Sequence, residues 1–267
     1  MPDRFRLIVS CARQSGSSPP NGEHRRAFDE AFIAAVSQQS LCSITIIPHL
    51  YDLPSDGPVF QHLQTFEEHL IVATWLPSRA AFWVLATAGV SGARATLDKQ
   101  PSGDDRRIWC LDLTKFDQAT DGLDVIRRIL SNANPPKSTE DTQIAVEWQD
   151  EPVGIRWYPV IDRDRCVNCL ECLNFCLFGV YDLDAVEHIT VQQPNACRPG
   201  CPACARVCPA GAIMFPEHTD PDISGDSAES KKNKSEKTPS PPSPSSVHSE
   251  TENRLDKLVD GLDDVDL

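Results

Sequence analysis

The chain has 267 residues, 40% of them hydrophobic, and a formal net charge of −14. This length allows one or two domains with a hydrophobic core, and the acidic balance argues against nucleic acid, whose recognition needs a basic face. No apolar run reaches the ~18 residues of a membrane span. The first apolar run is also too short for a signal peptide. We therefore expect a cytoplasmic protein without a membrane span.

Short apolar strands alternate with helices over the first 135 residues. The helical segment 23–39 illustrates the pattern, because Phe28, Phe32 and Val36 recur at intervals of four and form one buried stripe. Strands are expected at residues 4–11, 41–48, 70–76 and 107–113, and helices at 23–39, 59–68, 78–88 and 123–131. This alternation predicts an α/β domain with a mainly parallel sheet over residues 1–135. Residues 136–155 form a hydrophilic connector.

The loop after the first expected strand, residues 10–18, is rich in serine and glycine. Open α/β sheets bind ligands at such loops. The loop resembles the one that holds the FMN phosphate in flavodoxin-like proteins, which makes FMN a possible cofactor; a plain connector is the alternative. Cys11, Cys42 and Cys110 lie singly near apolar strands and are predicted to be buried free thiols.

Eight of the eleven cysteines fall within residues 166–209, in two runs of four. The first run contains Cys166, Cys169, Cys172 and Cys176, and the second contains Cys197, Cys201, Cys204 and Cys208. Three closely spaced thiolates on a tight loop can hold three corners of one cubane cluster. The fourth cysteine of each run lies one helical turn further on, so two such runs can exchange their fourth ligands. Eight thiolates match the needs of two four-iron clusters.

This pattern resembles the bacterial-type two-cluster ferredoxins, which carry two [4Fe–4S] centres, and the resemblance covers residues 157–218. It implies an α+β ferredoxin-type module over residues 156–218. Carried over position by position, it implies one cluster held by Cys166, Cys169, Cys172 and Cys208. The other cluster would be held by Cys176, Cys197, Cys201 and Cys204. It also implies that residues 158–162 pair with 211–215, and that 179–182 and 188–191 form a hairpin.

Two positions depart from the family pattern. Leu177 follows Cys176 where the family usually has proline, which alters a local turn but no ligand. One residue more than usual separates Cys197 from Cys201, and Gly200 can absorb it by adopting a positive φ. If Gly200 does not, Cys197 misses its iron and the second centre becomes [3Fe–4S]. Zinc is the other metal that paired Cys-x2-Cys motifs bind.

Residues 219–267 are predicted to form a disordered polar tail, because their Ser, Pro, Lys and Glu content leaves little apolar surface to bury. Half of the net charge lies in residues 216–267, which contain 13 acidic and 6 basic residues. At the end, residues 253–267 have leucine and valine at intervals of three and four among aspartates. We expect a short acidic amphipathic helix there. It is a candidate for docking on a partner, and a solvated helix or one packed on the protein itself is the alternative.

The sequence therefore predicts an iron–sulfur protein that transfers electrons between redox protein partners, and an electron carrier rather than an enzyme. One alternative is an oxidoreductase whose α/β domain binds a flavin that the clusters supply with electrons. Another is a sensor or interaction protein whose clusters report oxygen or iron. The four arginines Arg163, Arg165, Arg198 and Arg206 flank the cysteines. Such cations favour the reduced, more negative cluster, so we expect a somewhat raised reduction potential.

Overall fold

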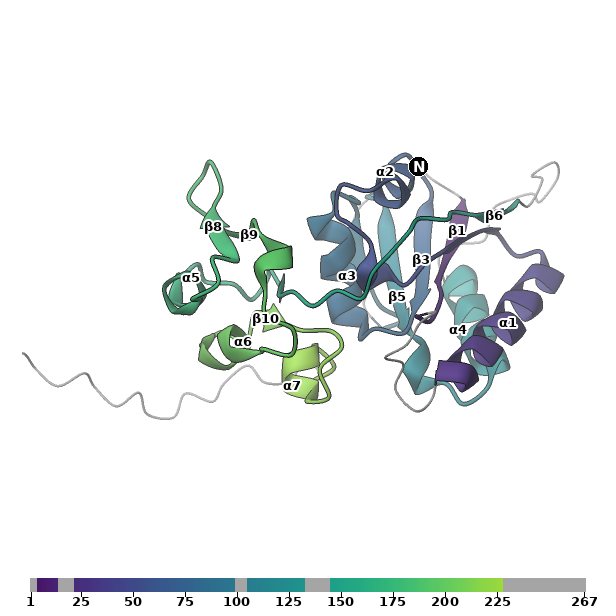
Figure 1. Ribbon diagram of the computed structural model, residues 1–267. Coiled ribbons are helices and arrows are strands. Elements are labelled where there is room, and N and C mark those ends of the chain that lie inside the picture. The colour runs from purple at the N-terminus through teal and green to yellow at the C-terminus, as the bar shows by residue number, and fades with distance from the viewer. Residues whose placement is uncertain (1–3, 14–21, 99–104, 133–144, 228–267) are drawn as a thin grey trace, which may run out of the picture. The chain divides into compact units, whose positions relative to one another are not determined.

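The structure is a computed structural model that describes residues 4–13, 22–98, 105–132 and 145–227 (Figure 1). Most of the predicted tail, including the acidic segment 253–267, lies outside the described residues. So does most of the loop 10–18 that resembles a phosphate cradle. Among the described helices, none has the length and apolar character needed to cross a bilayer.

A six-stranded sheet in which every pair of neighbours is parallel forms the first part of the chain. Its order is β4-β5-β3-β1-β2-β6. The strands are β1 (Phe5–Ser10), β2 (Ser43–Ile47), β3 (His69–Thr74), β4 (Ala93–Ala95), β5 (Arg107–Asp112) and β6 (Val146–Trp148). The central strands are almost wholly apolar because helices cover both of their faces. The predicted parallel α/β architecture is confirmed.

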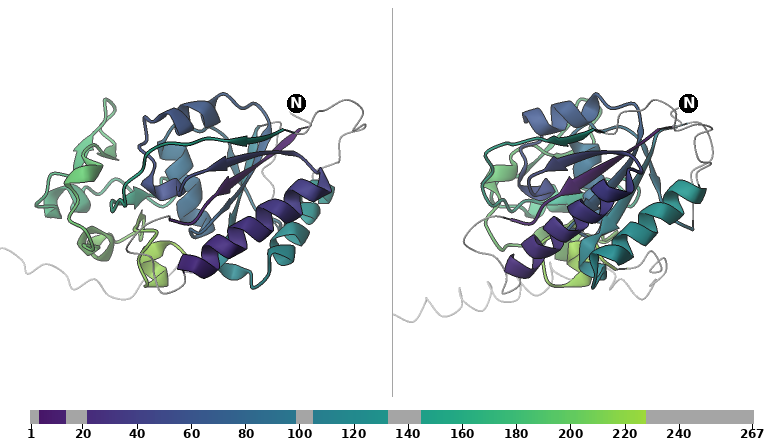
Figure 2. Two further views of the ribbon diagram at one scale, coloured as in Figure 1. Left: turned by 45° about the vertical axis from the view of Figure 1, so that its right-hand side comes forward. Right: turned by 90° about the vertical axis from the view of Figure 1, so that its right-hand side faces the viewer.

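Each face of the sheet has its own core, since side chains alternate along a strand. Leu7 and Val9 of β1 pack with Phe32 of helix α1 (Gly22–Gln39) and Ile126 of helix α4 (Ala119–Asn132). Ile8 points the other way. It packs with residues of α2 (Pro58–Gln64) and α3 (Ser78–Thr87). Figure 2 shows α1 and α4 running side by side along one face.

Strands β4 and β6 were not predicted, because each is only three residues long at an edge of the sheet. Strand β6 lies in the predicted connector, and its apolar residues Val146 and Trp148 are exposed. Strand β6 is instead bound to the rest of the sheet by its polar residue. Glu147 accepts hydrogen bonds from Arg6 at 2.8 Å and Thr45 at 2.6 Å. A polar cross-strand contact of this kind leaves no hydrophobic periodicity to detect.

The cysteine-rich part is built from two short antiparallel pairs and two short helices. Strand β7 (Val160–Ile161) pairs with β10 (Ile213–Met214), and β8 (Tyr181–Leu183) pairs with β9 (Ile189–Val191). Both pairings match the prediction. Helices α5 (Glu171–Phe175) and α6 (Ala203–Val207) each follow a cysteine loop.

The packed chain continues beyond the predicted module boundary at residue 218. Helix α7 (Pro221–Ser224) begins at Asp220, whose carboxylate accepts a hydrogen bond from the Asp222 N–H, and Gly225 ends it in the left-handed conformation. Ile223 is buried and its carbonyl accepts a hydrogen bond from the Phe215 N–H at 2.8 Å. The described structure therefore extends the packed part to residue 227, with residues 219–227 joining the core of the module.

Candidate iron–sulfur site

The first cysteine loop begins directly after strand β7. Asp162 is 2% exposed, and its carboxylate accepts hydrogen bonds from the N–H groups of Asp164 and Arg165 at 3.1 and 3.2 Å. The N–H of Cys166 donates to the Asp162 carbonyl at 3.0 Å. One buried aspartate thus fixes the turn that presents the first thiol of the run.

Two residues with a left-handed backbone conformation turn the same loop sharply at its second cysteine. Asn168 and Leu170 have φ values of 53° and 62°, on either side of Cys169. Asn168 is held by two bonds to the hairpin β8–β9, because it donates to the Glu187 carbonyl and accepts from the Ile189 N–H, both at 2.9 Å. Positive φ costs energy in residues other than glycine, so these bonds stabilise a conformation that the sequence alone disfavours.

The second cysteine loop is one residue longer than the first, and its residue with positive φ is a glycine. Gly200 has a φ of 76° and nothing within 4 Å of its missing side chain. The predicted positive φ is therefore confirmed. Cys201 lies two residues before helix α6, Cys204 is buried within the helix, and Cys208 is its C-cap residue.

A hollow beside β7 and β10 brings three cysteines of the first run together with the last cysteine of the second. Its walls include the apolar side chains of Ile161, Ile189 and Ile213. Its four cysteines are Cys166, Cys169, Cys172 and Cys208. This set is the one that the resemblance implies for one cluster.

The remaining four cysteines influence one another electrostatically. Burial raises the pKa of the Cys197 thiol to about 12, and the neighbouring Cys204, Cys201 and Cys176 add to that shift. Burial likewise raises the pKa of Cys204 to about 11, with Cys176 and Cys201 contributing. The fourth cysteine of the first run therefore lies among three thiols of the second.

In the described ranges, no three His, Cys, Asp or Glu side chains are arranged as ligands of a single metal ion. A cubane cluster makes a different demand, because each of its thiolates binds a separate iron atom. The fit of the residues to a cluster therefore depends on the donor set and its walls. Four soft thiolates per group, apolar walls and nearby N–H donors meet that demand.

Hydrogen-bond donors approach the sulfur atoms from outside. The Ala212 N–H donates to the Sγ of Cys208 at 3.3 Å, as expected for backbone amides around a cluster. The hydroxyl of Tyr181 is buried without a hydrogen-bond partner among the described residues, and it lowers the pKa of the Cys204 thiol, opposing the effect of burial. Trp157 donates from its indole N–H to the Cys201 carbonyl at 3.2 Å and stacks on Phe215.

The sheet domain, the part of the chain that contains strands β1 to β6, places a buried arginine against the cysteine-rich part. No sequence pattern indicates this contact. Arg79 of α3 is 4% exposed and lies 3.6 Å from the Asp162 carboxylate. It also donates to the Met214 Sδ at 3.0 Å and to the Gly211 carbonyl at 3.4 Å. Tyr51 of the sheet domain stacks on Tyr158 at 4.4 Å between ring centroids. The ion-pair role of Arg79 has no local sequence signal.

Of the four flanking arginines, two are tied to protein groups. Arg165 lies 3.7 Å from Asp162, and Arg163 donates to the Ile189 carbonyl. Arg198 and Arg206 are exposed. Pairing and solvation both weaken the field of these cations at the cysteines, and the raised potential stays a prediction.

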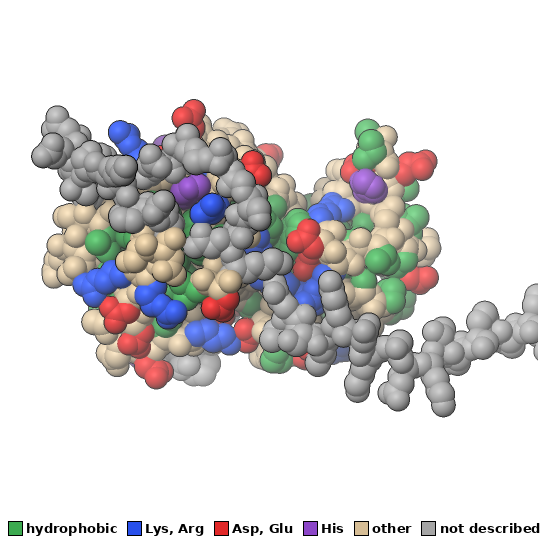
Figure 3. Space-filling model, turned by 180° about the vertical axis from the view of Figure 1, so that it is seen from behind, with side chains coloured by type: hydrophobic (Ala, Val, Ile, Leu, Met, Phe, Trp, Pro, Cys, Tyr) green, Lys and Arg blue, Asp and Glu red, His purple; other side chains and the backbone are tan. Residues whose placement is uncertain are grey.

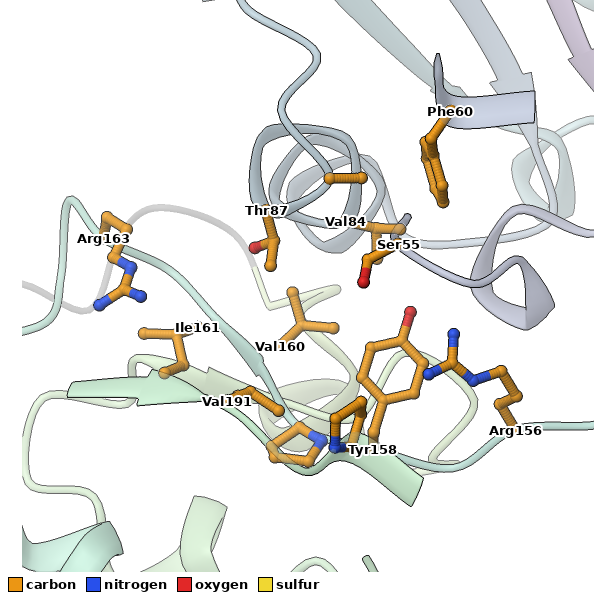
Figure 4. A pocket seen from close by; sticks show the side chains of 13 residues that line it. Ser55, Phe60, Val84, Thr87, Arg156, Tyr158, Val160, Ile161, Arg163 and Val191 are labelled. Carbon is orange, nitrogen blue, oxygen red and sulfur yellow. The ribbon is translucent and has the colours of Figure 1, made fainter. Parts of the chain in front are cut away.

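A pocket beside β7 is lined from both the sheet domain and the cysteine-rich part (Figure 4). Its side chains include Ser55, Thr87 and Val160, and the guanidinium of Arg156 lies over the Tyr158 ring at 4.6 Å. With about 40 Å³ of space, it has room for a few water molecules but not for a flavin.

A larger cavity of about 320 Å³ lies at the carboxyl ends of β1 and β2. The groups that would bind a phosphate there are already engaged by carboxylates. The Ala12 N–H donates to Asp29 at 2.7 Å, and Arg13 donates to Asp52 at 2.6 and 2.8 Å. His49 beside this cavity is 3% exposed and lies 3.2 Å from Glu217.

The three isolated cysteines are free thiols, as predicted, and are partly buried. Burial raises the pKa of Cys11 to about 12 and that of Cys42 to about 11. Both thiols therefore stay protonated at neutral pH, and neither is activated as a nucleophile.

The fold and the two cysteine groups define an iron–sulfur module of the ferredoxin type. No protein-family model matches the chain. An uncharacterized ferredoxin of Methanocaldococcus jannaschii is 43% identical over 76 residues, or 28% of this chain, and the chain spans about half (51%) of that relative. The pyruvate synthase subunit PorD of Methanothermobacter marburgensis is 37% identical over 57 residues, which are 21% of this chain and 63% of that subunit.

Ferredoxin-3 of Nostoc sp. is 32% identical over 77 residues, and the match covers 78% of that protein and 21% of this chain. The chain therefore belongs to the ferredoxin family through this part of its length. Its likeness to ferredoxins indicates an iron–sulfur electron-transfer role.

Proposed function

We propose that the protein is a one-electron carrier with two [4Fe–4S] clusters that exchange their fourth ligands between the two cysteine runs. Cys166, Cys169, Cys172 and Cys208 would hold the first cluster. Cys176, Cys197, Cys201 and Cys204 would hold the second. The observation that carries this proposal is the grouping of Cys208 with the first run and of Cys176 with the second.

When bound, each cluster accepts and releases one electron without a proton-transferring side chain. The chain's own residues would set how easily it does so. Ile161, Ile189 and Ile213 keep water away from the first cysteine group. The Ala212 N–H and the Tyr181 hydroxyl offer hydrogen bonds to sulfur, which favour the more negative reduced state.

The left-handed Gly200 supports a complete second cluster rather than a [3Fe–4S] centre. With φ at 76°, the extra residue is taken up in the loop. Cys197 thereby remains within electrostatic range of Cys201 and Cys204. All four cysteines of the second group are then available as ligands.

We propose that other redox proteins are its partners and that it works in the cytoplasm. The subunit name of the pyruvate synthase relative supports a role among redox proteins. The eleven free thiols support a reducing compartment, where dense cysteines bind metals rather than form disulfides.

A flavin oxidoreductase is the second candidate, and one observation favours it. The cavity of about 320 Å³ lies at the carboxyl edge of the sheet, beside β1, where the strand order changes direction. Against it, Asp29 and Asp52 occupy the N–H and guanidinium groups that a phosphate would need. The electron-carrier function therefore has the better support.

The test is anaerobic purification followed by iron, acid-labile sulfide, zinc and flavin assays on the same sample. About eight irons and eight sulfides per chain are expected, since each cubane contains four of each. Four or fewer irons, or one zinc per chain, would refute two intact clusters. One FMN released per chain would support the flavin oxidoreductase instead.

A further inference from the structure

Apolar side chains are exposed at both ends of helix α5. Phe175, Leu177 and Phe178, which flank Cys176, are 49%, 92% and 42% exposed. At the other end, Val167 is 67% exposed beside Cys169. Val167 lies in the cysteine loop four residues before α5, and the other three side chains lie at or just after the end of this five-residue helix. We call Val167, Phe175, Leu177 and Phe178 the apolar strip.

The strip is a local concentration rather than ordinary surface scatter. Ten large hydrophobic side chains are exposed among the described residues, and five of them fall between residues 167 and 186. The fifth, Val186, lies on the β8–β9 hairpin that Asn168 joins to the first cysteine loop. Grouped apolar exposure of this kind marks surfaces that another molecule covers.

The members of the strip are close in sequence to cysteines that the proposed clusters would use. Cys169 is exposed, and Cys176 is half-buried between Phe175 and Leu177. The Val167 side chain and Glu171 line the hollow of the first cysteine group. A partner seated on the strip would therefore approach both cysteine groups.

The surroundings of the strip are mainly acidic, although Arg163 donates a hydrogen bond to the Ile189 carbonyl of the neighbouring hairpin. From residue 167 to residue 196 the sequence has four acidic residues and no lysine or arginine. The acidic residues are Glu171, Asp182, Asp184 and Glu187, and all four are exposed. Figure 3 shows hydrophobic side chains beside acidic ones on the cysteine-rich end of the molecule.

Local hydrogen bonds keep one of these acids charged. The N–H groups of His188 and Val186 donate to the Asp184 carboxylate at 2.9 and 3.0 Å. They lower the pKa of Asp184, the His188 N–H most of all. The hairpin therefore presents a negative charge across the physiological pH range.

We propose that the apolar strip and its acidic surroundings form the docking face for a redox protein whose contact surface is apolar and rimmed by lysine and arginine. This inference rests on the proposed electron-transfer function. Charge attraction would speed the encounter, and the apolar centre would hold the complex. One electron then passes from the reduced cluster to an oxidised partner centre, with no proton moved and no bond broken.

The acidic surroundings argue against other occupants. The predicted C-terminal helix, residues 253–267, carries five acidic and two basic residues and would be repelled. A second copy of the chain would bring the same four acids against themselves. The experiment distinguishes each of these occupants from a redox protein.

The experiment uses the reduced full-length protein and a basic ferric c-type cytochrome as the probe, followed by stopped-flow absorbance. Leu177→Ser removes the most exposed member of the strip without changing charge. Its matched control is Ile155→Ser, at an apolar side chain that is 51% exposed outside the strip. We expect the second-order rate constant to fall about fivefold or more in Leu177→Ser and to change less than twofold in Ile155→Ser.

A charge test addresses the acidic surroundings. The double variant D182K/E187K should lower the rate about tenfold at low salt and flatten its dependence on ionic strength. The matched control is Glu30→Lys, at an exposed position on α1. Equal effects of the strip variants and their controls would overturn the proposal.

A neutral quinone as a small oxidant separates docking from cluster function. If the wild type reduces the quinone but not the cytochrome, the docking proposal fails and electron transfer stands. If it reduces neither, the proposed function fails. If Leu177→Ser slows the quinone equally, the residue supports the cluster rather than docking, which overturns the proposal. A wild-type dimer that Leu177→Ser dissociates, or a faster cytochrome reaction after removal of residues 228–267, would also overturn it.

Discussion

The sheet domain and the cysteine-rich module are stabilised by different kinds of interaction. The sheet domain buries large side chains such as Phe32, Phe60 and Trp109 on the two faces of six parallel strands. In the module, β7 and β10 have two residues each, and its core includes Cys172 and Cys204 themselves. Apolar burial is sufficient for the first region, whereas we expect the second to depend on what its thiols bind.

The largest expected effect follows from this contrast. Removing iron and sulfide should unfold the module while the sheet domain stays folded. Limited proteolysis of the cluster-free protein should cut within residues 160–215 and spare residues 22–98. Equal resistance of both regions with and without clusters would contradict the dependence of the module on its ligands.

The second prediction concerns the ion pair that joins the two regions. Arg79→Met should cost about 3–5 kcal/mol, because it removes the buried partner of the buried Asp162 carboxylate and leaves only the more exposed Arg165 nearby. Denaturant unfolding of the cluster-loaded protein measures this cost. Its control is Arg127→Met, which removes an exposed pair with Asp124 and should cost less than about 1 kcal/mol. Similar costs for the two variants would mean that burial of the first pair is unimportant.

The third prediction is a pH dependence that belongs to the sheet domain. Burial raises the pKa of Asp29 from 3.8 to about 6, against the lowering effects of the Ala12 N–H, Trp75, His49 and Arg25. A raised pKa means that the folded state holds the proton more tightly. Asp29 therefore contributes stability that is present below pH ~4 and is lost as the pH rises through about 6. The loss should be on the order of 2–3 kcal/mol.

Denaturant unfolding at a series of pH values checks this sign. In Asp29→Asn the decline of stability between pH 4 and 6 should be much smaller than in the wild type. A wild-type stability that rises steadily over the same interval would contradict the assignment.

The smallest predicted effect is on the second cysteine group. Tyr181→Phe removes the hydroxyl that lowers the pKa of the Cys204 thiol, so the reduction potential of that cluster should fall. One hydrogen bond of about 0.5–1.5 kcal/mol corresponds to roughly 20–65 mV for one electron. Protein-film voltammetry measures the shift. Tyr51→Phe serves as the control, because its hydroxyl bonds to the backbone of Tyr158 and not to a cysteine.

Hydrophobic periodicity was enough to predict most of the sheet domain. The stripe of Phe28, Phe32 and Val36 and the apolar strands recur at the intervals that helices and strands require. The edge strands β4 and β6 were not predicted, because three residues are too few to show a hydrophobic period. Strand β6 is held by Glu147, a contact between residues far apart in sequence.

The cysteine spacing predicted which thiols lie together, since Cys208 lines one hollow with Cys166, Cys169 and Cys172. Even the conformation of Gly200 followed from one extra residue between Cys197 and Cys201. The residues that surround the thiols could not be predicted from the cysteine spacing. Arg79 and His49 reach their partners through tertiary contacts that no local spacing records.

The exchange of fourth ligands is tested most directly by EPR of the fully reduced protein and of single cysteine variants. Wild type should show two interacting paramagnetic centres per chain. Cys208→Ala should alter the same centre as Cys172→Ala, and Cys176→Ala should alter the same centre as Cys204→Ala. If Cys208→Ala instead perturbed the centre that Cys204→Ala perturbs, each run would hold its own cluster and the crossed arrangement would be wrong.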